Sequence, residues 1–170
     1  GEVAQSPLGR LHMLDAAALG EGIFVTCFLA QLRFPNLEDE GRCASAALGP
    51  GAAGSLLRWG PAASLEPSTW DISVSALSSL RRQFVVAFER GQRGKLLIVM
   101  AGSVDASGQV HFGPSLEGSA PLNYLRAQRP SLVALSAEEV LLAAADQSVD
   151  FQAVVVKMRL RNASDGQVAS

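Results

Sequence analysis

Apolar and polar side chains alternate along two segments of the chain, with the period of two that is typical of a β-strand with one buried face. In 69–76, TWDISVSA, the apolar positions are Trp70, Ile72 and Val74. In 151–161, FQAVVVKMRLR, apolar and basic side chains lie on opposite faces. The apolar set is Val154, Val156, Met158 and Leu160, and the basic set is Lys157, Arg159 and Arg161. This pattern predicts a half-buried last strand with a basic outer surface.

Other segments are apolar at almost every position, which predicts strands that are buried on both faces. The longest is 23–34, IFVTCFLAQLRF, which is apolar up to Leu29 and alternates after it. Its β-branched and aromatic residues favour a central strand. Shorter strands are expected at 9–15, 56–59, 84–88, 96–100 and 110–112.

Between these strands the composition predicts loops. Acidic residues make 37–42 an exposed loop after Pro35. The stretch 43–64 is rich in Ala, Gly and Pro and predicts a loose insertion that is disordered over 49–54, and 162–170 predicts a flexible tail.

Helix is expected at two places only. Ser136 and Glu139 have the spacing of a capping box, which predicts a helix over 136–145, and 77–82 predicts a single helical turn. The elements together predict an all-β fold, an antiparallel β-sandwich of about eight strands with one or two short helices. We expect a single domain over residues 1–170.

Composition adds an expectation about partners. Hydrophobic residues make up 48% of the chain and charged residues 18%, against about 25% charged residues in an average globular protein. This predicts apolar surface that is covered by a protein partner or by the rest of a longer polypeptide. The net charge of −2 argues against general nucleic-acid binding, which needs a basic surface. No signal peptide and no apolar run near 20 residues is found, so no membrane span is expected.

The two cysteines bear on the cellular compartment, but the sequence does not show whether they are free or joined by a disulfide. Cys27 and Cys43 match no zinc pattern, and a disulfide between them stays open at this point. A domain of this size does not require one, so a reducing cytoplasmic location is expected, at a membrane or cytoskeletal assembly. The triplet that begins at Asn162 fits the glycosylation sequon, but such triplets arise by chance.

The stretch 88–100, FERGQRGKLLIVM, has part of the pattern of a phosphate-binding loop. A P-loop needs a glycine where Glu89 stands and a hydroxyl residue where Leu96 stands, followed by a helix. The residues after Lys95 have the pattern of a strand. The stretch therefore predicts a turn between antiparallel strands.

The sequence also lacks the catalytic and metal-binding patterns for which we searched it. The two histidines, His12 and His111, both fall in predicted strands, where a general base is uncommon. No Gly-x-Ser-x-Gly elbow occurs. The acidic run 38–40 has consecutive carboxylates, whereas calcium loops use alternate positions. We expect no enzyme activity, no cofactor and no metal.

Basic residues near the predicted turn and on the last strand are the candidate binding site. A patch of this kind attracts phospholipid headgroups or an acidic protein segment, although charged residues on edge strands also serve solubility alone. The candidate residues are Arg81, Arg82, Arg90, Arg93, Lys95, Lys157, Arg159 and Arg161.

Three segments resemble the calcium- and lipid-binding β-sandwich domain first named in protein kinase C. They are 9–29, GRLHMLDAAALGEGIFVTCFL; 68–102, STWDISVSALSSLRRQFVVAFERGQRGKLLIVMAG; and 150–162, DFQAVVVKMRLRN. The resemblance is one of pattern over most of the chain and has no diagnostic motif. The third loop of that family supplies calcium-binding aspartates, whereas 90–94 here is RGQRG. The resemblance therefore implies calcium-independent docking to lipid or protein.

Together these observations predict a non-enzymatic protein-protein interaction or scaffolding module of a larger polypeptide or assembly. The alternative is a calcium-independent domain that docks on phospholipid headgroups at a membrane surface. An enzyme with an unrecognised site is the third class.

Overall fold

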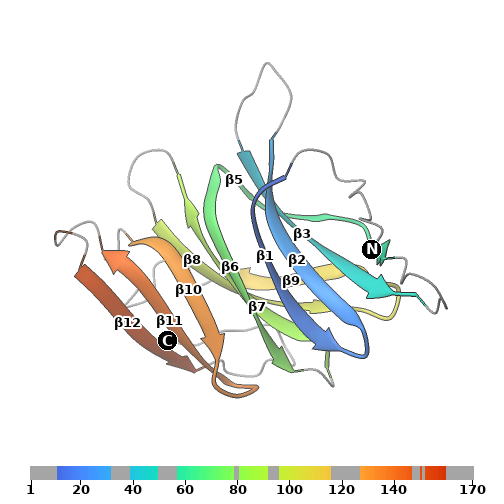
Figure 1. Cartoon of the computed structure of the whole chain (residues 1–170). Helices are drawn as coiled ribbons and strands as arrows, with labels where there is room; N and C mark the ends of the chain where they lie inside the picture. The colour runs from blue at the N-terminus through green and yellow to red at the C-terminus, as the bar shows by residue number, and fades with distance from the viewer. Residues whose placement is uncertain are drawn as a thin grey trace, which may run out of the picture.

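The structure is a computed structural model and describes residues 11–31, 39–49, 57–78, 81–91, 96–115, 127–146, 150 and 152–159. These residues form twelve strands in three antiparallel sheets (Figure 1). The predicted all-β, antiparallel class is confirmed. The predicted strand count of about eight was too low.

The first sheet, sheet A, is built from the N-terminal part of the chain. Its strands pair in the order β1 (Leu11–Gly20), β2 (Ile23–Gln31), β3 (Asp39–Leu48) and β4 (Leu57–Trp59), and β5 (Ala63–Pro67) also pairs with β3. The second sheet, sheet B, has the order β6 (Thr69–Ser78), β7 (Gln83–Arg90), β8 (Leu96–Val104) and β9 (Val110–Ser115). The third, sheet C, has the order β10 (Ala127–Ala134), β11 (Glu139–Asp146) and β12 (Gln152–Arg159).

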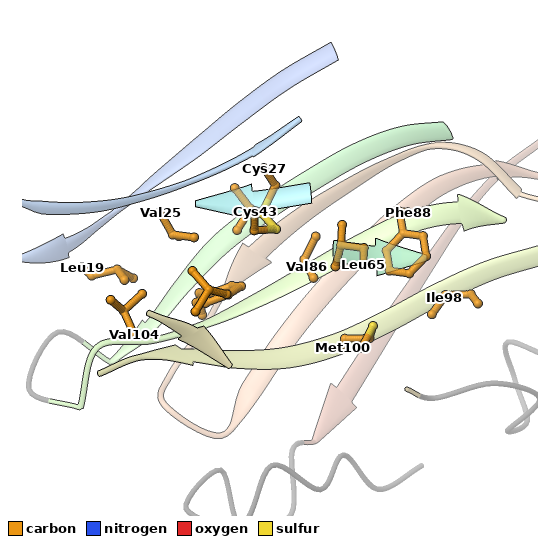
Figure 2. Packing of buried hydrophobic residues seen from close by; sticks show 13 residues of the cluster. Leu19, Val25, Cys27, Cys43, Leu65, Val86, Phe88, Ile98, Met100 and Val104 are labelled. Carbon is orange, nitrogen blue, oxygen red and sulfur yellow. A yellow bond between two sulfur atoms is a disulfide. The ribbon is translucent and has the colours of Figure 1, made fainter. Parts of the chain in front are cut away.

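Sheet B contributes to two separate hydrophobic cores, one on each face. Along β7, Phe84, Val86 and Phe88 belong to the core that is shared with sheet A (Figure 2). The intervening Val85 and Ala87 belong to the core that is shared with sheet C. This explains why 84–88 and 97–100 are apolar at every position: neither strand has a solvent-facing side there, as predicted, whereas Leu96 at the start of β8 is 41% exposed.

The edge strand β6 connects sheet B to both neighbours through polar groups. The Asp15 carboxylate on β1 accepts the backbone N–H of Val74 at 2.8 Å. On the opposite face, the Ser73 and Ser75 hydroxyls accept the N–H groups of Leu132 and Ala134 on β10, at 3.1 and 3.0 Å. Backbone donors that would be left without partners at these sheet edges are thus paired.

Cys27 and Cys43 form a disulfide that joins two directly paired residues of β2 and β3. Both side chains are fully buried in the core between sheets A and B. The question that the sequence left open is answered in favour of the bridge, and a reducing compartment remains an untested expectation.

The predicted helix over 136–145 is wrong, since β11 occupies Glu139–Asp146. The Ser136 hydroxyl does accept the N–H groups of Glu138 and Glu139, but the turn that it stabilises closes the β10–β11 hairpin. Val140, Leu142 and Ala144 are all buried, which is a period of two that the alanine-rich composition obscured. The helical turn expected at 77–82 is also not seen, because Leu77 and Ser78 belong to β6 and the described Arg81 and Arg82 form a turn.

Two of the predicted loops are largely strands. Residues 39–42 begin β3, and three strands occupy much of 43–64. Alanine and glycine fit here because β3 lies between neighbours on both sides and is buried at Gly41 and from Cys43 to Ala46, where large side chains lack room. Most of 49–54 and the predicted tail 162–170 lie outside the described residues.

Candidate interaction surface

The outward face of sheet C carries apolar side chains that no described residue covers. Its inward face packs on sheet B, whereas Val133, Leu135 and Val155 are 50%, 52% and 59% exposed. Strand register places Val133 beside Leu141 and Val155 beside Ala143, so an apolar strip crosses the three strands diagonally. Exposed apolar residues that form a contiguous group are typical of interaction sites.

The basic residues on this face are paired with acidic ones. Lys157 Nζ lies 3.1 Å from Glu139 Oε1, and Arg159 Nη2 lies 3.4 Å from Glu138 Oε2. Because all four side chains are solvent-accessible, these pairs add little to the free energy of folding. They offset the positive charges of Lys157 and Arg159, two of the three basic residues that the sequence predicted for the outer surface of the last strand.

The strand at the rim of this sheet, β12, is a regular edge that no other described strand pairs with (Figure 1). It pairs with β11 without a register shift from Glu139–Arg159 to Asp146–Gln152. Edges elsewhere in the described structure are modified: β1, β9 and β10 carry register shifts, and β4 is a three-residue strand. Bulges and short strands are common means of preventing unwanted edge pairing, so β12 is the edge best suited to accept another strand.

The described members of the predicted basic patch lie at several places. Arg81 and Arg82 precede β7 and Arg90 ends it, which separates them by roughly 25 Å at a strand rise of about 3.3 Å per residue. Arg82 lies 3.6 Å from Glu21 across the gap to sheet A. Lys157 and Arg159 lie on sheet C, and Arg93, Lys95 and Arg161 are outside the described residues.

The β8–β9 turn holds a histidine-carboxylate pair. His111 Nε2 lies 2.9 Å from Asp105 Oδ2, while Asp105 Oδ1 accepts bonds from the Ser107 hydroxyl and from the N–H groups of Ser107 and Gln109. The Ser107 hydroxyl bond, then the His111 contact, hold the pKa of Asp105 far below its ordinary value. Together these bonds shape the turn.

This turn borders a cavity of about 320 Å³, which also reaches Ile23, Arg58 and Arg82. The side chains are nevertheless not arranged for nucleophilic catalysis. The Ser107 hydroxyl is bonded to the carboxylate at 2.6 Å, whereas a catalytic serine bonds to the imidazole. His111 is solvent-exposed and does not line the cavity.

Metal and membrane candidates receive no support from the described residues. No group of three or more His, Cys, Asp or Glu side chains in this part of the chain could hold a metal ion. Glu40, from the acidic run at 38–40, instead forms an ion pair of 2.6 Å with Arg42. None of the described segments is a helix long and apolar enough to cross a membrane.

The sequence pattern missed Val155 as a surface residue. The alternation in 151–161 assigned the outward face to basic residues, although Val155 interrupts that face at an odd-numbered position. The run Val154-Val155-Val156 was the available signal, because a strand with one buried face has no structural need for three valines in succession.

No family model, curated protein or solved structure matches the chain. The resemblance to the protein kinase C domain therefore stays a prediction.

Proposed function

We propose that this chain is a non-enzymatic protein-protein interaction module, and that sheet C is its recognition surface. The observation that carries the proposal is Val155, an apolar side chain that is 59% exposed on a regular edge strand. A partner strand that is added to β12 would bury this side chain and satisfy the backbone groups of the edge. The three sheets would then act as a stacked β-sandwich scaffold that holds the surface rigid.

Charge on the surface supports a protein partner over a membrane. Anionic headgroups are attracted by basic residues whose charge is not cancelled. Lys157 and Arg159 already have acidic partners within 3.4 Å. A nearly neutral surface with an apolar strip is closer to the centre of a protein interface.

The proposal is tested by placing a photo-crosslinking amino acid at Val155 of the full chain in its native cells. The matched control is Leu14, which is 57% exposed on β1 of sheet A. We expect polypeptide adducts from position 155 and few from position 14. Equal labelling at the two positions would refute sheet C as the recognition surface.

The membrane alternative is tested separately by sedimentation with vesicles that contain phosphatidylserine. Under the proposed function, the domain stays in the supernatant. Sedimentation that is abolished by Arg90→Glu with Arg93→Glu would replace the proposal with lipid docking.

A further inference from the structure

We infer that the strand that pairs with β12 is β12 of a second copy of this chain, in an antiparallel dimer with a twofold axis at Val155. This inference rests on the proposed function, because it names the partner of the same surface. It follows from the side chains of β12 and from their positions in the strand register.

The edge strand leaves its inward side chains incompletely covered. Val140, Leu142 and Ala144 on the central strand β11 are buried, whereas Val154 and Val156 on β12 are partly exposed although they pack on the same core. A strand added beyond β12 would complete their burial. Burial of this apolar surface would favour association.

A twofold axis perpendicular to the sheet keeps the two faces of β12 continuous across the dimer. Each inward residue then meets an inward residue, and each outward residue an outward one. The core beneath sheet C becomes one apolar layer that spans both copies. A second copy provides this match by symmetry.

The side chains select one register among those that the twofold axis allows. With the axis at Lys157, two like charges would be directly opposite, which is destabilising. With the axis at Val156, the two Lys157 side chains would still be diagonal neighbours. With the axis at Val154, the overlap would extend only from Gln152 to Val156.

The axis at Val155 avoids these costs. It pairs Val155 with itself on the outer face and Val154 with Val156 on the inner face. Lys157 then lies opposite the small Ala153, and the two Lys157 residues are about 13 Å apart along the strands. In this register, Asp150 of one copy comes one position beyond Arg159 of the other, where it adds an acidic residue beside the Arg159–Glu138 ion pair.

Cysteine crosslinking tests this register directly, because both native cysteines are already in the Cys27–Cys43 bridge. In Val155→Cys, the two introduced thiols would lie on directly opposite residues, whose Cβ atoms are about 4.5–5.5 Å apart. We expect mild oxidation to give a covalent dimer, in which mass spectrometry finds two copies of the peptide that contains position 155 joined by a disulfide. Ala153→Cys is the matched control on the same outward face, and its thiols would be about 13 Å apart, too far to bridge. It should crosslink at least about tenfold more slowly.

Light scattering of the full chain over a dilution series provides the second measurement. We expect concentration-dependent dimers that Val155→Lys abolishes and that Leu14→Lys, an equally exposed site on sheet A, leaves intact. Circular dichroism checks that each variant keeps its strand signal.

Two results overturn the second copy as the partner. One is a chain that stays monomeric at every concentration, and the other is equal crosslinking at positions 153 and 155. If the photo-crosslinker at position 155 then captures a different polypeptide, the proposed function stands and only the dimer fails. If it captures nothing, both fail.

Discussion

Sheets A and C cover opposite faces of the same central sheet, yet they are held there in different ways. Sheet A contributes a disulfide to the core that it shares with sheet B, where Leu19 of sheet A and Phe84 and Phe88 of sheet B are fully buried. Sheet C contributes Val140, Leu142, Ala144 and Met158 to the other core, and its first strand depends on hydroxyl groups of β6 for backbone partners. Sheet A is crosslinked by the Cys27–Cys43 disulfide, whereas the described part of sheet C has no crosslink and leaves apolar side chains exposed on its outer face. This difference supports the proposal that sheet C is the recognition surface.

The largest expected effect comes from removal of the disulfide. Cys27→Ala with Cys43→Ala should lower the free energy of unfolding by about 3 kcal/mol, because the bridge closes a loop with a sequence separation of 16. Urea denaturation of the oxidised protein and the double variant measures this. Reductant should destabilise the wild type and leave the double variant unchanged. If Ser73→Ala lowered the free energy of unfolding by the same amount, the contrast between sheets A and C would be contradicted.

Substitution of two neighbouring valines on β7 allows a direct comparison of the two cores. Val86→Ala creates a cavity toward sheet A and Val85→Ala one toward sheet C, and both side chains are fully buried. Each should cost roughly 2 kcal/mol of stability. Native-state hydrogen exchange should show faster opening of sheet C in Val85→Ala and of sheet A in Val86→Ala. Identical exchange patterns would mean that the three sheets open as one unit.

The hydroxyl contacts of β6 should have a smaller effect. Ser75→Ala leaves the N–H of Ala134 without its acceptor, which should cost about 1 kcal/mol and speed exchange of that amide. Ser73→Ala should do the same at Leu132. Ser103→Ala on β8 is the control and should change neither amide.

The smallest effect concerns pH at the β8–β9 turn. Since the pKa of Asp105 is lowered in the folded chain, its ionised form stabilises the fold above about pH 4, the ordinary range of the group, and this contribution is lost as the pH falls toward the lowered value. Asp105→Asn should therefore be less stable than wild type at pH 6, with a difference that narrows toward pH 3. Thermal unfolding at the two pH values measures it. A constant difference would show that the carboxylate charge is not responsible.

The fold class followed from the sequence because the strands of sheet B carry a strong signal. Residues 84–88 and 96–100 are apolar throughout, and the structure places 84–88 and 97–100 between two cores. The strand β11 was misassigned because alanine and leucine are good helix formers in isolation. Tertiary packing on Val85 and Leu97 selected the period of two instead.

The candidate surface was less predictable than the fold. The sequence identified Lys157 and Arg159 as outward-facing, and the structure confirms their exposure. Their partners Glu138 and Glu139 were assigned to a helix, so the cancellation of charge was not foreseen. Pairing across strands depends on register, which a single sequence does not specify when the neighbouring element is misassigned.

The position of sheet B between two covers has a consequence for synthesis of the chain. Sheets A and B are complete once the ribosome has passed residue 115, but the face of sheet B that carries Val85, Ala87, Leu97 and Val99 has no cover until residues 127–159 emerge. Translation proceeds at about 5–20 residues per second. The apolar face of sheet B is therefore exposed to solvent for seconds on every nascent chain. A stop codon between residues 115 and 127 would release a chain without sheet C, in which the same apolar face stays exposed to solvent. Such a chain should aggregate.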